Sequence, residues 1–183
     1  MANQKKRFKQ KREKPEFEQK LLDLARVTRV VKGGRRFSFR ATVVIGNKNG
    51  KVGLGVAKGA DVSVAINKAV ADAKKNLVNI ARVDSSISFE VREKFGAARV
   101  MIKPAKEGKG IVAGGAMRAV IEFSGIRDIT AKSFGCSNKI NVAKATIKAL
   151  GMLEGKSFEP AKNVNAQKEV VAGKEGDKKE TDK

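Results

Sequence analysis

Residues 32–45 read KGGRRFSFRATVVI and decide the fold of the first half of the chain. They follow RVTRVVK at residues 26–32, a run typical of a strand. Gly33 and Gly34 supply the positive φ that a tight hairpin turn needs. After the turn, apolar residues alternate with polar or cationic ones. The apolar set is Phe37, Phe39, Ala41, Val43 and Ile45, and the polar set is Arg36, Ser38, Arg40 and Thr42. Because neighbouring side chains of a strand point to opposite faces, this pattern predicts a half-buried strand with a cationic outer face.

The same region carries charge of one sign. Between Asp23 and Asp61 there is no carboxylate but there are nine cations: Arg26, Arg29, Lys32, Arg35, Arg36, Arg40, Lys48, Lys51 and Lys58. The whole chain of 183 residues has 40 Lys and Arg against 19 Asp and Glu, a formal charge of +21. A one-signed field over folded structure attracts a polyanion, so we expect a nucleic-acid partner. The alternatives are an inert basic surface and a membrane-surface protein, although no helix pairs a Lys face with Trp or Phe.

The composition excludes most enzyme chemistry. Histidine is absent and Cys136 is the only cysteine, which removes the usual general base, any Ser-His or Cys-His pair and a zinc site. A single cysteine also cannot form an internal disulfide and fits a reducing cytoplasm. No apolar run approaches the roughly 18 residues of a membrane span, and no apolar signal region follows the basic N-terminus. We expect a cytoplasmic, non-enzymatic protein with no cofactor, metal or membrane association.

The first half is predicted to be a small antiparallel sheet with one helix. Residues 1–20 are read as a basic flexible arm that turns helical towards residues 21–24, and residues 21–82 as a first domain. Strands are expected at 26–32, 36–45 and 51–57, with a second turn at 47–50. Asp61 offers a helix N-cap, and apolar residues then recur at helical spacing as far as Leu77 and Ile80.

The second half is predicted to be a two-layer α/β sandwich over residues 83–155. Strands are expected at 87–92, 99–103 and 127–134, with helices at 116–123 and from an Asn141 cap to residue 153. Residues 156–183 have balanced charge and no periodicity, so we expect a disordered tail. The fold class is therefore α+β, with an antiparallel sheet and helix followed by the sandwich.

The candidate nucleic-acid site is the hairpin with its neighbouring cations. Arg suits this role because its planar fork binds phosphate oxygens two at a time. The alternative is an ordinary hairpin with basic flanks. Phe37 and Phe39 are not favoured as base-stacking residues, because the alternation places them on the core side. The candidate nucleic-acid-binding residues are Arg26, Arg29, Lys32, Gly33, Gly34, Arg35, Arg36, Arg40, Lys48 and Lys51.

A second candidate is the glycine-rich loop KEGKGIVAGG before the helix at 116–123. We interpret it as a surface for RNA or a neighbouring protein, formed by Gly108, Gly110, Gly114, Gly115 and Arg118. Two alternatives stay open at this point. Tight internal packing is one, and a nucleotide phosphate cradle using Lys109 is the other. The cradle is disfavoured because the sequence is not G-x-x-x-x-G-K-[ST] and no acidic pair nearby would hold Mg²⁺.

Three long segments together resemble a known family. They are VVKGGRRFSFRATVVIGNKNGKVGLG, KPAKEGKGIVAGGAMRAVIEFSGIRDITAKSFG and SNKINVAKATIKAL. They are similar to the family of the fifth protein of the bacterial small ribosomal subunit, over about residues 21–153. The chain departs from the family pattern at Asn138-Lys139, where the family has Asn-Pro. It also departs at residues 58–63, and no RNA contact is carried over to 59–63.

The resemblance implies a fold and a function. The first half would resemble a double-stranded-RNA-binding domain. The second would be an α/β domain of a type shared with some GHMP kinases and a translation-factor domain. The protein would be a structural component of the 30S subunit that binds 16S rRNA, lies beside the fourth and eighth small-subunit proteins, and influences assembly and decoding accuracy. The RNA-facing hairpin would map to residues 32–36, and the face near the fourth protein to the glycine-rich loop and Arg118. A free-standing double-stranded-RNA binder or RNA chaperone is the rival reading.

Overall fold

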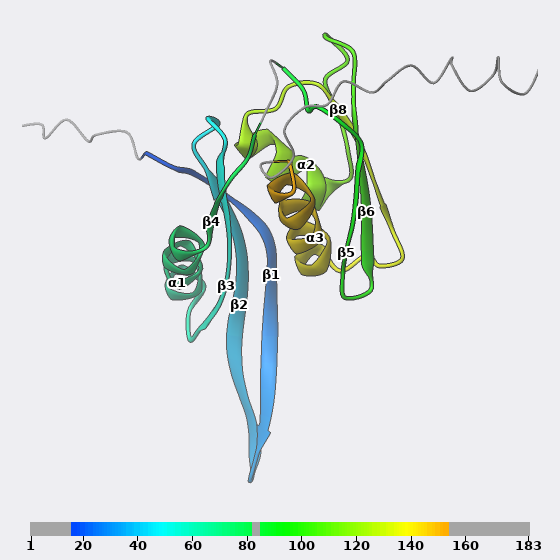
Figure 1. The fold of residues 1–183 in the computed structure, drawn as a ribbon. Helices are drawn as coiled ribbons and strands as arrows, with labels where there is room; N and C mark the ends of the chain where they lie inside the picture. Colours follow the sequence, from blue (N-terminus) through cyan, green and yellow to red (C-terminus); the bar gives the residue numbers. More distant parts are fainter. Residues whose placement is uncertain (1–15, 82–84, 154–183) are drawn as a thin grey trace, which may run out of the picture.

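The computed structural model describes residues 16–81 and 85–153, and its first half is an antiparallel sheet with one helix (Figure 1). The strand order is β1-β2-β3-β4. Helix α1, Val62–Lys75, packs on β2 and β3 through Ala65, Ala69 and Ala73. The strands are β1 Glu18–Val31, β2 Gly34–Gly46, β3 Lys51–Gly59 and β4 Leu77–Asn79.

The second half is a mixed sheet covered by two helices. Its strand order is β5-β6-β8-β7, antiparallel except for the parallel pair β7 and β8. Helices α2 and α3 lie between this sheet and the first one (Figure 1). Their bounds are Gly115–Ser124 and Lys139–Gly151. The strands are β5 Val91–Phe95, β6 Ala98–Pro104, β7 Ile111–Val112 and β8 Ile129–Phe134. The predicted α+β class is confirmed.

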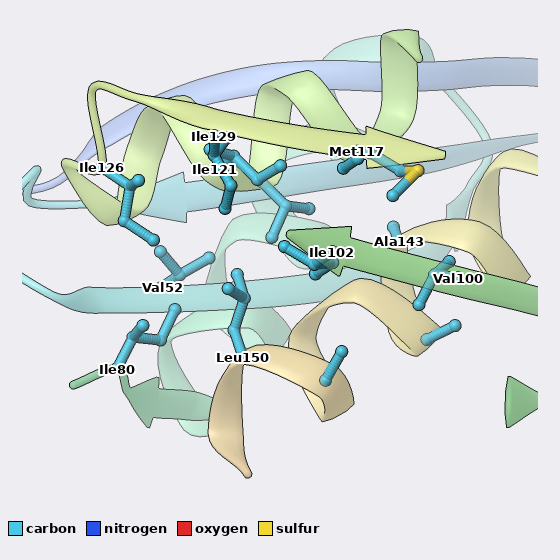
Figure 2. Packing of buried hydrophobic residues seen from close by; sticks show 14 of the residues in the cluster. Val52, Ile80, Val100, Ile102, Met117, Ile121, Ile126, Ile129, Ala143 and Leu150 are labelled. Atoms are coloured by element: carbon cyan, nitrogen blue, oxygen red, sulfur yellow. The ribbon is translucent and has the colours of Figure 1, made fainter. Parts of the chain in front are cut away.

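One large apolar core joins the two halves. Val44 and Val52 from the first sheet belong to the same buried cluster as Met117 of α2 and Leu150 of α3. Figure 2 shows Val52 and Ile80 facing Leu150 and the inner side of the second sheet. The two sheets therefore share α2 and α3 as a common middle layer. The domain limits at residues 20, 82 and 155 stay predictions; residues 1–15, 82–84 and 154–183, which include the predicted tail, lie outside the described residues.

Several predicted elements differ from the structure. No helical turn forms near residues 21–24, because β1 begins at Glu18 and pairs with β2 along its whole length. Helix α1 ends at Lys75, and residues 77–79 pair with β3 instead of continuing the helix. The first strand of the second sheet begins at Val91, not at residue 87. Asn138, not Asn141, caps α3, its side chain accepting a hydrogen bond from the Ile140 amide at 3.1 Å.

Strand β2 does not have one buried and one cationic face along its length. Residues 41–46 are buried on both faces, since α1 covers one side and α2 packs on the other. Residues 34–37 are exposed, because that part of the strand runs beyond both helices. The expectation of one buried face and one exposed cationic face was therefore wrong. Burial along β2 depends instead on the distance of each residue from the hairpin tip.

Candidate nucleic-acid interface

The β1–β2 hairpin projects from the body of the protein as a two-stranded ribbon (Figure 1). Strands β1 and β2 pair out to Val31 and Gly34, but β3 pairs with β2 only from Phe39 to Gly46. Residues 27–38 therefore have no third strand beside them in the described part of the chain. Five of the predicted cations lie on this ribbon or at its base: Arg26, Arg29, Lys32, Arg35 and Arg36.

The register of the hairpin places like charges together. Arg29 and Arg36 are direct cross-strand partners, and Arg35 lies opposite Val30. Like charges directly opposite one another on a sheet are destabilising. None of the three arginines has a carboxylate within 4.0 Å among the described residues. A bound polyanion would remove this repulsion, so the hairpin is better suited to a phosphate backbone than to open solvent.

Phe37 lies on the exposed hairpin and not in the core. Its side chain is 45% exposed, and the Arg26 guanidinium lies 3.7 Å from the centroid of its ring. The expectation that Phe37 faces the core was therefore wrong, because the strand leaves the body of the protein before this position. The Phe37 ring positions the Arg26 guanidinium through a cation–π contact. The N–H donors of this guanidinium can bind phosphate, and its plane can stack on a base. Phe37 lies on the predicted face of β2, together with Phe39 and Ala41, but the core on that face does not extend as far as Phe37.

The remaining predicted cations lie elsewhere. Arg40 is half-buried near the base of the hairpin, and its guanidinium lies 3.9 Å from the Asp23 carboxylate. Lys48 lies in the β2–β3 turn at the other end of the sheet, where its ammonium is 2.7 Å from Glu18. Lys51 begins β3 at the same end. The structure thus brings five predicted cations together and separates Lys48 and Lys51 from them.

The two glycines of the hairpin tip differ in what the fold requires of them. Gly33 has a φ of +86°, a conformation that side chains rarely adopt. Gly34 has no such φ, and a Cβ added to it would meet nothing within 4 Å. The fold therefore requires glycine at position 33 only. A glycine at position 34 leaves room for something outside the chain to approach the backbone.

The glycine-rich loop is closed onto a carboxylate of its own chain. The Gly110 amide donates to Asp128 at 2.8 Å, and Asp128 is 5% exposed. This hydrogen bond, followed by those from Ser85, Gly108 and Lys109, lowers the pKa of Asp128 although burial raises it. The Gly110 amide is therefore not available to a phosphate. This geometry disfavours the nucleotide cradle.

The later glycines and Arg118 form an exposed end of α2. Gly114 and Gly115 are exposed, and an added Cβ would meet nothing at either position. Internal packing therefore does not explain glycine there. Arg118 lies one turn further on and is also exposed. These residues form a surface that a neighbouring molecule can approach closely. Within residues 16–81 and 85–153 no cluster of metal-ligating side chains occurs, and no helix is long and apolar enough to span a membrane.

Two family models match the chain in sequence. Residues 17–81 match the N-terminal domain of ribosomal protein S5, and residues 93–163 match its C-terminal domain. Together the matches span more than half of the chain. The chain belongs to the ribosomal protein S5 family. The resemblance inferred from the three segments is thereby confirmed, and the family is a structural component of the small ribosomal subunit, not a family of enzymes.

Relatives from Campylobacter jejuni support the same assignment. Proteins named small ribosomal subunit protein uS5 from strains 81-176 and RM1221 are each 50% identical to this chain over 146 residues. The aligned region covers 80% of this chain and 99% of each relative. The S5 family assignment therefore extends over nearly the whole length of these relatives, and it includes both the basic hairpin and the glycine-rich loop.

Proposed function

We propose that this chain is a non-enzymatic structural component of the small ribosomal subunit, in the cytoplasm, and that it binds 16S rRNA through the β1–β2 hairpin. The observation that carries the proposal is the projection of the hairpin cations beyond the body of the protein. Among the described residues, no third strand flanks residues 27–38, and Arg29 faces Arg36 with no carboxylate nearby. Membership of the S5 family supports the ribosomal context.

The hairpin contacts would position the protein and not read sequence. Arginine and lysine bind phosphates without regard to the base, and such contacts fix register and orientation. Arg26, Arg29, Lys32, Arg35 and Arg36 supply the charges, and Gly34 allows the RNA backbone close to the tip. Arg40 adds charge at the base, while Lys48 and Lys51 would meet RNA only at the opposite end of the sheet.

A salt titration of the full chain with a 16S rRNA fragment tests this proposal. If about six phosphates are contacted, affinity should fall about 10³–10⁵-fold between about 50 and 200 mM salt. Replacing Arg35→Glu and Arg36→Glu together should weaken binding and reduce the salt slope by about one for each phosphate that is no longer bound. The matched control is Lys68→Glu with Lys75→Glu on the exposed side of α1, which changes the net charge equally. Equal weakening in both double variants would contradict a site at the hairpin.

Sucrose-gradient fractionation distinguishes the ribosomal role from a free-standing RNA binder. A structural component should sediment with 30S particles at about one copy each, whereas a free regulator or RNA chaperone should remain near the top of the gradient. Subunit assembly and decoding accuracy should both decline in cells that carry only the Arg35→Glu, Arg36→Glu chain. Normal assembly and accurate translation in those cells would remove the hairpin from the site.

The protein partners are proposed from the glycine-rich loop. We propose that the fourth small-subunit protein lies against the surface formed by Gly108, Gly110, Gly114, Gly115 and Arg118, and that the eighth is a second neighbour of this chain. The open space at Gly114 and Gly115 supports a close contact there. Gly114→Val with Arg118→Glu should reduce crosslinking of this chain to the fourth protein in 30S particles. Unchanged crosslinking would show that the loop faces another component.

A further inference from the structure

The second sheet has an outer face that no described element covers. Helices α2 and α3 pack on its inner face, where Val91, Val100, Ile102 and Ala131 are buried (Figure 1). The side chains that alternate with these point outward. We name this set the outer face: Arg92 and Lys94 of β5, Arg99, Met101 and Lys103 of β6, and Thr130, Lys132 and Phe134 of β8.

The strand register arranges the outer face in rows. Lys94 pairs with Arg99, and Arg99 pairs with Phe134, so these three side chains cross the sheet side by side. The next row contains Arg92, Met101 and Lys132 in the same way. Phe134 is 48% exposed. An open hollow on this face is lined by Arg92, Lys94, Arg99, Met101 and Phe134, together with Glu93 and Val100 from the intervening positions. The Glu93 carboxylate is paired with Lys148 of α3, 2.8 Å away.

The charge of the outer face is almost entirely positive. Glu90 accepts from Arg92 at 2.7 Å and from Lys103 at 3.2 Å. Lys94, Arg99 and Lys132 have no carboxylate partner among the described residues. Five cations thus share this face with one exposed aromatic ring, and the Glu90 carboxylate pairs with two of them. An acidic partner fits this surface, and a basic or neutral protein does not.

We propose that the outer face is a second RNA-binding surface, and that it takes an unpaired segment of RNA. An exposed aromatic ring on an open sheet stacks on a base only when that base is free of its duplex. Phe134 would stack on one base while Lys94, Arg99 and Lys132 contact the phosphates on either side. This inference goes beyond the proposed function, because the hairpin belongs to the first sheet and lies on the other side of α2 and α3 (Figure 1).

The test uses the full chain in which Arg35→Glu and Arg36→Glu already weaken the hairpin. The probe is a fluorescent single-stranded oligouridylate of about ten nucleotides, within the usual range of site sizes, and a duplex of the same length is the comparison. Phe134→Leu removes the ring and keeps apolar bulk, whereas Phe134→Tyr keeps a ring that can stack. Lys94→Glu with Arg99→Glu removes phosphate contacts, and Lys68→Glu with Lys75→Glu is the matched charge control.

We expect Phe134→Leu to weaken binding of the single strand about tenfold, Phe134→Tyr to leave it nearly unchanged, and the duplex to be insensitive to both. Lys94→Glu with Arg99→Glu should weaken binding and reduce the salt slope by about 1.4, at about 0.7 for each single-stranded phosphate that the face binds. Equal binding by parent and face variants would overturn the inference while leaving the hairpin proposal intact. If the outer-face variants also failed to enter 30S particles while binding oligouridylate normally, the RNA-binding inference would again be overturned. The outer face would then be assigned to a protein partner.

Discussion

At the scale of single residues, Gly33 and Gly34 separate a requirement of the fold from a requirement of binding. Gly33 needs its left-handed backbone, whereas Gly34 has an ordinary φ and open space where a side chain would stand. The sequence alone makes the two positions look equivalent. Their difference depends on backbone angles at the tip, and it leads to opposite expectations for the same substitution.

Gly33→Ala should destabilise the turn by about 1–2 kcal/mol, the usual strain of a left-handed non-glycine residue. Gly34→Val should leave the urea midpoint of unfolding nearly unchanged, because nothing in the chain meets the new side chain. It should nevertheless weaken binding to a 16S rRNA fragment by blocking the backbone. Urea unfolding and RNA titration of both variants measure the two effects. Tight RNA binding by Gly34→Val would contradict close approach at the tip.

Asp128 gives a pH-dependent contribution to stability. Its pKa is lowered in the folded chain, chiefly by the hydrogen bond from the Gly110 amide. Because the pKa of Asp128 is lowered in the folded chain, the carboxylate stabilises the fold fully when the pH is above the ordinary aspartate pKa of about 3.9. This contribution declines as the pH falls through the lower pKa of the folded chain. Asp128→Asn should therefore lower stability at pH 7 and flatten the loss of stability below about pH 4. Unfolding midpoints of both chains across this range provide the measurement, and parallel curves would contradict it.

At the scale of elements, the contact between α1 and β3 depends on a glycine that has nothing to do with RNA. A Cβ at Gly55 would collide with the carbonyl oxygen of Ala69. Gly55→Ala should therefore force the helix away from the sheet and lower the free energy of unfolding by about 1–3 kcal/mol. Gly115→Ala is the control, since an added Cβ there meets nothing. Equal stability of both variants in urea would show that α1 adapts without cost.

Strand β2 shows how far sequence patterns reach. The strand and its Gly33-Gly34 turn follow from local chemistry and could be predicted. The burial of its faces could not, because it depends on α2, which lies far along the chain and packs against β2 on the side of Thr42 and Val44. The exposure of Phe37 has the same origin. An alternating pattern indicates two faces, but it does not say what lies against each of them.

The same limit applies to the candidate sites. The cations of the hairpin could be predicted from the run of positive charge between Asp23 and Asp61. Lys48 and Lys51 belong to the same run in sequence and were therefore predicted to lie with them. The antiparallel path of β2 carries these lysines to the other end of the sheet. The outer face could not be predicted, because its cations are spread over β5, β6 and β8 and only the register assembles them.

At the scale of the whole molecule, the two halves are expected to unfold together. Leu150 of α3 is fully buried in the cluster that also contains Val44 and Val52 of the first sheet. Leu150→Ala should cost about 2–5 kcal/mol and should lower the stability of both sheets. Native-state hydrogen exchange would show reduced protection of amides in β2 as well as in α3. Reduced protection confined to the second half would contradict a shared core.

The whole molecule also presents its cations on two sides, the hairpin of the first sheet and the outer face of the second. Between them lies an apolar middle layer formed by α2 and α3 (Figure 1). Such an arrangement suits a protein held between separate segments of one large RNA, where the phosphates offset a formal charge of +21.

The most direct test of the hairpin proposal is a density map of the small ribosomal subunit that contains this chain. We predict that the side chains of Arg35 and Arg36 lie within hydrogen-bond distance of 16S rRNA phosphates, with the backbone of Gly34 packed against the RNA. A hairpin tip surrounded by solvent, with no nucleotide near any of its arginines, would contradict the account.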